Sequence, residues 1–405
     1  MTGAATRGAG RESSLSDETA MLPADPGHEP SRESRSVLLL SQLPPPYGGL
    51  AVHSERLRAM LERRGWRVEV VSPPRWASFA DRSFPRVRLY AAQAQFLARL
   101  LRRRCTLLHD HISTYAIGER SAGAAIVHLL QLATLRFGAS PWVVTSGNGL
   151  LPGQLAAAPR WRRAAIRFLY GGASFAIAKS EPIRSAFEQM GLAGRTEVVG
   201  TFLEPVAPPA ARPLPPAVRA YLDVHPLCIS SAGFSFQPLY HLDAVVRAAA
   251  FLRKEGPAHG LPGNAGLVIL ASHAEDPVGK PAFDAALAET GLEGDILVLR
   301  DVDNALEIIS KTSVFVRATD VDGDANTVKE AMLVGVPVVA TDLPGRPPGL
   351  RLVDRGRLAD LGAAVLAALL ERDASRLDAA RSFVHEDIER NAAAILAVYD
   401  RAGGA

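Results

Sequence analysis

The chain alternates short apolar runs with amphipathic segments of helical spacing almost from end to end. The first apolar run, Val37–Ser41, leads into the turn Pro44–Gly49, and leucines at helical spacing then follow until Gly65. A second apolar run lies at Val68–Val71. A strand, a glycine turn, a helix and a second strand make a βαβ unit, in which the two strands are parallel. The alternation therefore predicts an α/β fold built on parallel sheets.

The alternation stops once, in a stretch between Pro205 and Pro216 that is dense in proline and alanine. Such a stretch cannot hold regular structure, so we interpret it as a linker. The alternation resumes at Leu227 and continues to about Leu370. The sequence thus predicts two doubly wound, Rossmann-like domains. The predicted divisions are an N-terminal domain at 35–204, a linker at 205–216, a C-terminal domain at 217–375 and a C-terminal helical segment at 376–405.

Length and composition exclude several classes of protein. The 405 residues exceed what one hydrophobic core usually organises, and 48% hydrophobic with 21% charged residues is ordinary for a globular protein. A formal net charge of +3 is too small to indicate a nucleic-acid partner. Cys105 and Cys228 lie too far apart to suggest a metal site, and so few cysteines fit a reducing, cytoplasmic compartment.

Residues 1–34 are rich in Gly, Ser, Glu, Asp and Arg and contain few large apolar side chains. We expect them to form a disordered tail rather than a secretory signal, because they lack an apolar central region. Elsewhere the apolar runs fall short of the ~20 residues that span a bilayer. The expectation is a cytoplasmic protein, soluble or peripheral on the inner face of the membrane.

Three segments carry a family resemblance. They are Pro44–Gly49 with His53 shortly after it, Asp322–Met332, and Gly335–Asp342. In order and spacing the chain resembles the family-four group of retaining glycosyltransferases, known as glycosyl transferases group 1. The fold of that group is GT-B, in which two Rossmann-like domains face each other across a cleft. The second and third segments are the specific ones, since a glycine turn alone is common.

The resemblance implies a hexosyltransferase that needs neither metal nor cofactor. Its N-terminal domain would bind a glycan or lipid-linked acceptor, and its C-terminal domain a UDP- or GDP-linked sugar donor. The implied process is cell-surface polysaccharide synthesis. The C-terminal helix of such a fold can return to the N-terminal domain.

The chain departs from the family pattern at four places. Asp322 stands where the family usually has the first of two glutamates, and Ser146-Gly147 stands where it has His-Gly. The basic pair that normally grips the donor diphosphate is missing from Gly233–His241. Arg317 and Arg346 flank the acidic loop instead. Arg317 is our candidate for the missing cation, because a guanidinium can hold phosphate oxygens with two hydrogen bonds.

Asn326, Thr327 and Val328 should begin a helix, where free backbone N–H groups can bind a phosphate without a metal. By resemblance, Glu330 then accepts hydrogen bonds from both ribose hydroxyls. An alternative is that Thr327 and Glu330 form a capping box, in which Glu330 only satisfies a backbone N–H.

By resemblance, Asp322 faces the sugar ring and helps catalysis, and Asp324 is its rival for that contact. A loop-capping turn is the structural alternative for both carboxylates. Gly48 and Gly49 would let the backbone approach the donor, or would simply make a tight turn. His111 would orient the acceptor, although a lone histidine is more often structural.

Two basic runs lie at Arg102–Arg104 and Arg160–Tyr170. The second mixes arginines with Trp, Phe and Leu at helical spacing, which is typical of a helix on an anionic membrane surface or of a solvated helix face.

A nicotinamide-dependent enzyme is disfavoured, because no G-x-G-x-x-G follows the first strand. The rival from another class is a catalytically silent GT-B-like partner in a polysaccharide assembly complex, and the missing basic pair supports it.

Overall fold

The computed structural model describes residues 35–72, 94–98, 100, 105–111, 113–118, 122–206, 213–272 and 276–403. These residues belong to one compact unit. The predicted tail at 1–34, the arginine run at Arg102–Arg104 and the middle of the predicted linker lie outside the described residues. The domain boundaries proposed from the sequence stay predictions.

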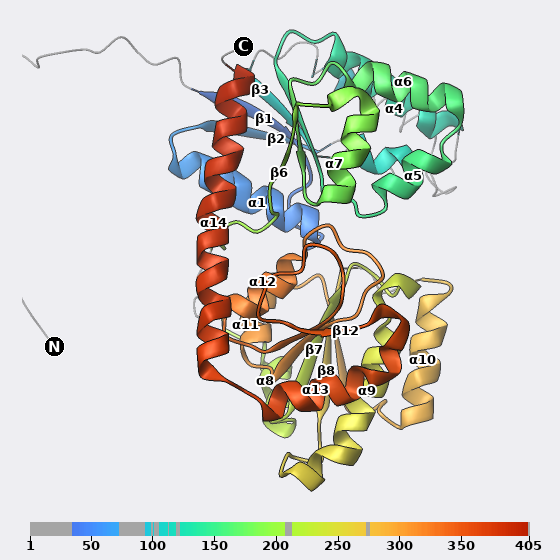
Figure 1. Ribbon diagram of the computed structural model, residues 1–405, viewed down its shortest axis with the longest axis vertical. Helices are drawn as coiled ribbons and strands as arrows, with labels where there is room; N and C mark the ends of the chain where they lie inside the picture. Colours follow the sequence, from blue (N-terminus) through green and yellow to red (C-terminus); the bar gives the residue numbers. More distant parts are fainter. Residues whose placement is uncertain are drawn as a thin grey trace, which may run out of the picture. The chain divides into compact units, whose positions relative to one another are not determined.

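The N-terminal half contains a six-stranded sheet in the order β2-β1-β3-β4-β5-β6, and each neighbouring pair is parallel (Figure 1). Its strands are β1 (Ser36–Leu40), β2 (Arg67–Val71), β3 (Leu107–Asp110), β4 (Trp142–Ser146), β5 (Phe175–Ala178) and β6 (Thr196–Val198). The helices and helical turns described in this half are α1 (Gly49–Arg63), η1 (Ser113–Gly118), α4 (Ala122–Arg136), α5 (Leu151–Ala157), α6 (Arg160–Tyr170), α7 (Glu181–Phe187) and η2 (Glu188–Leu192).

The C-terminal half repeats the plan with the strand order β12-β11-β10-β7-β8-β9, again parallel throughout. Its strands are β7 (Cys228–Gly233), β8 (Gly266–Ala271), β9 (Ile296–Arg300), β10 (Val314–Arg317), β11 (Val338–Thr341) and β12 (Arg351–Val353). Its helices and helical turns are α8 (Pro216–Val224), η4 (Pro238–Tyr240), α9 (Leu242–Glu255), η5 (Gly256–His259), α10 (Gly279–Thr290), α11 (Ala305–Ser310), α12 (Asn326–Leu333), η6 (Arg355–Asp360), α13 (Leu361–Leu370) and α14 (Ala374–Gly403).

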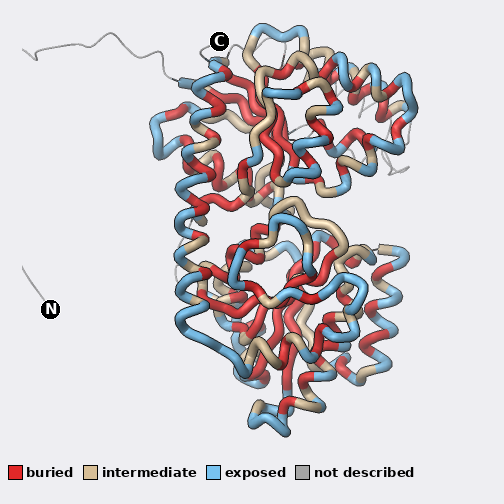
Figure 2. Tube along the Cα trace, in the orientation of Figure 1, coloured by how far each residue is buried: buried red, intermediate tan, exposed pale blue. Residues whose placement is uncertain are grey.

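The apolar runs form strands because both faces of each sheet are covered. In β1, Leu38 packs in the cluster shared with α4, α6 and α7, whereas Leu39 packs in the cluster on the other face, shared with α1 and α14. Side chains that alternate between two dry faces require continuous apolar runs, which is the pattern seen in the sequence. Figure 2 shows this burial concentrated in the two sheets.

Helix α14 packs against both halves. Val384 belongs to a core cluster of the C-terminal half, and Tyr399 belongs to the cluster beneath the N-terminal sheet. The C-terminal helix therefore returns to the N-terminal domain, and the fold predicted from the alternation is confirmed.

The strand order reverses between β1 and β3 in the first sheet and between β7 and β10 in the second. In doubly wound sheets, ligands bind outside the carboxyl ends of the strands at this point of reversal. The glycine turn follows β1 and the acidic loop follows β10. The fold thus places both sequence motifs where a ligand site is expected.

Candidate active site

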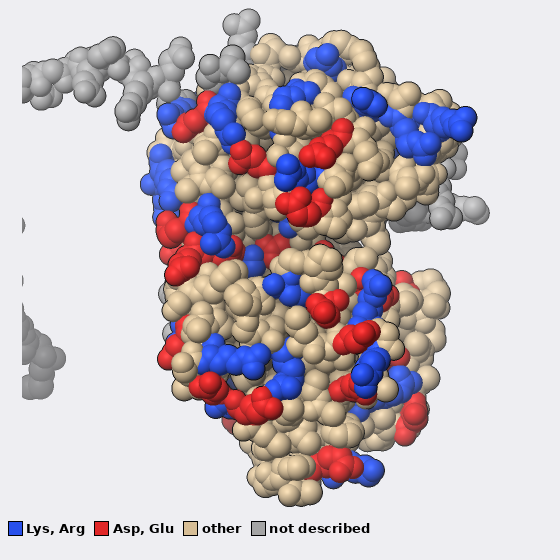
Figure 3. Space-filling view, in the orientation of Figure 1, with Lys and Arg blue, Asp and Glu red and all other residues tan. Residues whose placement is uncertain are grey.

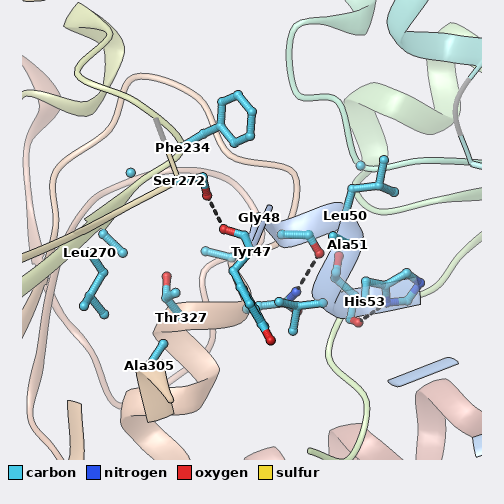
Figure 4. A pocket seen from close by; sticks show the side chains of 18 of the residues that line it. Tyr47, Gly48, Leu50, Ala51, His53, Phe234, Leu270, Ser272, Ala305 and Thr327 are labelled. Carbon is cyan, nitrogen blue, oxygen red and sulfur yellow. Dashed lines mark hydrogen bonds between the residues drawn. The ribbon is translucent and has the colours of Figure 1, made fainter. Parts of the chain in front are cut away.

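A cavity of about 690 Å³ lies between the two halves. Residues after β1, β4 and β5 line it from the N-terminal half, and residues after β7, β8, β9 and β10 line it from the C-terminal half. Figure 4 shows the Tyr47–Gly48 turn of the first half lying against Phe234 and Ser272 of the second. Eight of the residues predicted for the site line this cavity: Gly48, Gly49, Arg317, Asp322, Asp324, Asn326, Thr327 and Glu330.

Asp322 is held by two arginines. Arg317 donates from Nε to Oδ2 at 3.0 Å and from an Nη to Oδ1 at 3.3 Å, and Arg346 donates to Oδ2 at 3.1 Å. Burial alone would raise the pKa of Asp322, but the two guanidinium groups hold that pKa below its ordinary value. The carboxylate is therefore ionised and fixed in place at the cavity wall.

Arg317 also contacts the segment that lacks the family's basic pair. It donates to the Ala232 carbonyl oxygen at 2.6 Å, and its guanidinium lies 5.2 Å from the centre of the Tyr240 ring. Burial alone would lower the pKa of Arg317, yet its pairing with Asp322 keeps that pKa above the ordinary value. The structure thus brings a permanent cation to the loop after β7, where the sequence offered none.

Asp324 bridges the two halves of the unit. Its Oδ2 accepts a hydrogen bond from the Thr201 backbone N–H at 2.5 Å and another from Lys329 Nζ at 2.6 Å. Lys329 in turn contacts Asp387 of α14 at 2.8 Å. Asp324 is therefore tied into an ion-pair network that spans the acidic loop, α12 and α14.

Glu330 projects from α12 and forms a buried ion pair with Arg56 of α1. The capping-box alternative is wrong. The helix begins at Asn326, so Thr327 lies inside it, and its N-cap position is Ala325, which makes no side-chain cap. Asn326 Nδ2 donates to the Gly49 carbonyl oxygen at 3.2 Å, which joins the start of α12 to the glycine turn.

Gly48 and Gly49 differ in their surroundings. A Cβ built on Gly48 would lie 3.3 Å from the Phe234 ring, whereas one on Gly49 would have nothing within 4 Å. Gly48 therefore permits the close approach of the two halves, and Gly49 borders open space in the cavity. Val328 does not line the cavity, because its side chain is buried in the core beneath α12.

His111 is not brought to the cavity. Its Nδ1 lies 3.1 Å from Ser54 Oγ, and its Nε2 lies 3.2 Å from Nε2 of His109, which contacts Tyr399 of α14. Burial lowers the pKa of His111 to about 3. These contacts place His111 in a neutral, buried network that packs α14 on the sheet, and its predicted catalytic role gains no contact with the cavity.

His53 and Lys179 also line the cavity, although the sequence analysis assigned neither of them a role in the site. His53 Nδ1 donates to the Thr201 carbonyl oxygen at 2.7 Å, and its buried Nε2 has no hydrogen-bond partner in the described part of the chain. Lys179 follows β5, is 5% exposed, and donates to the Gly200 carbonyl oxygen at 3.1 Å. Lys179 could have been identified from the sequence, because it stands at the carboxyl end of a buried parallel strand, where ligands bind.

Metal ligands do not gather at this cavity or elsewhere in the described residues: no group of three His, Cys, Asp or Glu side chains there could hold a metal ion. The charges at the cavity wall are instead supplied by arginine, lysine and carboxylate side chains.

Comparisons with known proteins agree with this geometry. Residues 47–205 match the family Glycosyltransferase Family 4, and residues 236–371 match the family Glycosyl transferases group 1. No curated protein matches the chain in sequence.

Several solved structures share the fold. Sucrose-phosphate synthase from Thermosynechococcus elongatus has a TM-score of 0.65 at 16% identity, over 91% of this chain and 98% of that one. HepE from Anabaena, in complex with UDP and glucose, has a TM-score of 0.63 at 16% identity, over 90% and 99%. A trehalose-6-phosphate protein from E. coli, bound with UDP-2-fluoro glucose, has a TM-score of 0.62 at 17% identity, over 90% and 99%. With two parallel Rossmann-like domains and both family matches, the chain is a GT-B glycosyltransferase whose two halves belong to Glycosyltransferase Family 4 and Glycosyl transferases group 1.

Proposed function

We propose that this glycosyltransferase moves a hexose from a UDP- or GDP-linked donor to a glycan or lipid-linked acceptor in cell-surface polysaccharide synthesis. The observation that carries the proposal is that one cavity gathers Glu330, Asp322 and the start of α12. The structures of HepE with UDP-glucose and of the E. coli protein with UDP-2-fluoro glucose support a UDP-linked donor.

Each of these groups has a task in the proposal. The free N–H groups at the start of α12 and the Arg317 guanidinium stabilise the diphosphate, whose negative charge grows as the glycosidic bond breaks. The ribose hydroxyls donate to Glu330, whose ion pair with Arg56 uses Oε1. Asp322 faces the transferred sugar. A carboxylate accepts but never donates while ionised, which suits it to bind hydroxyl groups.

The proposed stereochemical outcome is retention. The leaving phosphate oxygen accepts the proton of the acceptor hydroxyl on the same face of the sugar, so no protein nucleophile is needed. Since guanidinium and backbone N–H groups stabilise the diphosphate, turnover should be independent of metal. Activity that EDTA abolished and Mn²⁺ restored would contradict this part of the proposal.

Calorimetric titration with UDP-, GDP- and ADP-sugars tests the proposal. We expect a UDP- or GDP-sugar to bind and to be consumed with a glycan acceptor. Binding without transfer or hydrolysis would favour the silent partner in an assembly complex. Failure of all three donors to bind would refute the proposal.

The proposal includes an anionic membrane surface as a further partner. On α6, Trp161 and Phe168 are 62% and 61% exposed, and Arg160 and Arg167 are exposed beside them. Basic side chains gather where α6 lies in the space-filling view (Figure 3). Exposed aromatic and basic residues on one helix suit a surface of acidic lipid headgroups. No helix in the described part of the chain is long and apolar enough to cross a membrane.

Sedimentation with vesicles of phosphatidylglycerol or phosphatidylcholine tests this surface. We expect binding to the acidic vesicles only, and expect the double substitution W161S/F168S to remove it. The matched control is Val224→Ser on α8, which changes a side chain of similar exposure, 62%, on the other half. Equal binding by the double variant would exclude α6 as the contact.

A further inference from the structure

Lys179 differs from the other buried cations around the cavity. Arg317 is paired with Asp322, Arg56 with Glu330, and Lys329 with Asp324 and Asp387. Lys179 forms no ion pair in the part of the chain that the structure describes, and donates one hydrogen bond, to the Gly200 carbonyl oxygen. An ammonium has three donors, so two of them remain for a ligand.

Burying an ammonium without a counter-charge is unfavourable. Burial lowers the pKa of Lys179 to about 7, although the carboxylate of Asp324 partly opposes that effect. An anion that entered the cavity would place a counter-charge in direct contact with the ammonium and would stabilise the protonated lysine. Burial therefore disfavours the protonated form of Lys179, and a bound oxyanion would stabilise that form.

The surroundings of Lys179 locate the anion. A Cβ built on Gly147 would lie 3.7 Å from Lys179 Cγ, and the Gly147 carbonyl oxygen packs against Gly323 of the acidic loop. The stem of Lys179 therefore passes Gly147, which in turn contacts the loop that carries Asp322. His53 lines the same cavity, and its Nδ1–H is donated to Thr201, so its free Nε2 can accept a hydrogen bond from a hydroxyl.

We propose that Lys179 is the cation of an oxyanion subsite, which binds a phosphate group of a substrate, with His53 accepting a hydrogen bond from a neighbouring hydroxyl. The inference rests on the proposed function, because the substrates are those of the transferase. The phosphate can come from two sources, the diphosphate of the donor or a phosphate on the acceptor.

The test measures binding to the full-length chain by calorimetry, with Lys179→Met, Lys179→Arg and the control Lys254→Met. Lys254 is 82% exposed and lies on α9. The first arm titrates UDP and uridine. The second arm titrates inorganic phosphate, glucose 6-phosphate and glucose into protein saturated with UDP, or into free protein if UDP does not bind. A thermal melt of each variant confirms that it is folded.

If the donor diphosphate binds at Lys179, Lys179→Met should weaken UDP binding at least tenfold, equivalent to about 1.4 kcal/mol. The affinity for uridine, which has no phosphate, should not change. If an acceptor phosphate binds at Lys179, Lys179→Met should leave UDP binding unchanged. Its affinity for inorganic phosphate and glucose 6-phosphate should fall by a similar factor, and its affinity for glucose should not change. In both cases Lys179→Arg retains most of the affinity and Lys254→Met retains all of it.

The subsite is overturned if Lys179→Met binds UDP, inorganic phosphate and glucose 6-phosphate within twofold of the wild type, or if the wild type binds none of them. Failure of the proposed function is a separate result. A wild type that binds no nucleotide but binds inorganic phosphate through Lys179 would refute the transferase proposal and support the subsite.

Discussion

Apart from Arg56, which pairs with Glu330 across the cavity, the two walls differ in how their buried charges are paired. On the C-terminal wall, Arg317 faces Asp322 and Lys329 faces Asp324, so each charge has a partner before any substrate arrives. On the N-terminal wall, Lys179 has no carboxylate partner among the described residues, and Nε2 of His53 has no hydrogen-bond partner there.

The difference indicates which wall is assembled in advance. Paired charges are fixed in position, so the C-terminal wall can offer a rigid surface to the nucleotide and the sugar. Unpaired groups are favourable only when a ligand satisfies them. The N-terminal wall is therefore expected to decide which substrates the cavity accepts, and the predictions that follow contrast the two walls.

The largest expected effect is on Asp322. Replacing it with Asn leaves Arg317 and Arg346 buried without their shared anion, and removing one partner of a buried pair costs about 3–5 kcal/mol. We expect a loss of that order in the free energy of unfolding, measured in urea. The control is Asp243→Asn, which breaks the exposed pair with Arg247 and should cost under about 1 kcal/mol. A loss as small as that of the control would show that the C-terminal wall is not held by this pair.

The second effect is on nucleotide affinity. Glu330→Gln should weaken UDP binding by about 1.5–3 kcal/mol, or roughly tenfold or more, because a charge-assisted hydrogen bond is lost. Glu330 also pairs with Arg56, so calorimetry with 2′-deoxy-UDP separates the two roles. The wild type should prefer UDP, and the variant should bind both nucleotides with the same low affinity. A variant that kept the preference would exclude a contact between Glu330 and the 2′-hydroxyl.

The third effect tests where the walls meet. A Cβ on Gly323 would lie 2.6 Å from the Gly147 carbonyl oxygen. Gly323→Ala must push one loop away from the other, which we expect to cost about 1–3 kcal/mol in the free energy of unfolding and to lower turnover. Gly294→Ala is the control, since a Cβ there would have nothing within 4 Å. Equal stability of the two variants would show that the loops do not depend on this contact.

The same contrast explains what the sequence could reveal. The acidic loop and α12 were found because one short run, Asp322–Glu330, holds the carboxylates and the helix start together. Arg56, which pairs with Glu330, comes from α1, and Lys179 follows β5. Both lie far away in the chain, and no local spacing connects them to that run. The end of a strand predicts a site role for His111, but its side chain points into the network with Ser54 and His109. Strand ends can be predicted from periodicity, whereas the direction of a side chain there depends on packing between distant elements.

The fold itself was predictable for a physical reason. Strands buried on both faces must be apolar throughout, so β1 and β4 stand out as continuous runs against amphipathic helices. The strand order was not available from those runs, because it depends on which parallel edges pair. The position of α14 under the first sheet likewise depends on Tyr399 and its neighbours, which contact residues some three hundred positions away.

The last prediction compares two buried lysines, Lys179 of the N-terminal wall and Lys329, which is paired with Asp324 of the C-terminal wall. Lys329→Met leaves Asp324 and Asp387 without their common cation and should lower the free energy of unfolding. Lys179→Met should raise it at neutral pH, because it removes an ammonium that burial makes unfavourable and that has no ion-pair partner in the described structure. Substitutions of the same kind at the two walls are thus expected to have opposite signs.

The pH dependence sharpens that test. The pKa of Lys179 is lowered in the folded chain from 10.5 to about 7, so between these values the unfolded chain binds one proton more than the folded chain. Wild-type stability should therefore rise with pH relative to Lys179→Met, by at most about 1.4 kcal/mol per pH unit, and the advantage of the variant should shrink from pH 7 towards pH 10. Below pH 7 the folded lysine is protonated as well, so the difference between the two proteins should level off.

The other groups that interact electrostatically with Lys179 are present in both proteins, so their contributions to the difference in stability largely cancel. These groups are Asp324, Lys329, Asp387, His53, His109 and His111. Urea denaturation of both proteins from pH 6 to pH 10 measures this difference. A difference that did not change with pH would mean that the charge of Lys179 is compensated within the protein and that the two walls do not differ in charge pairing.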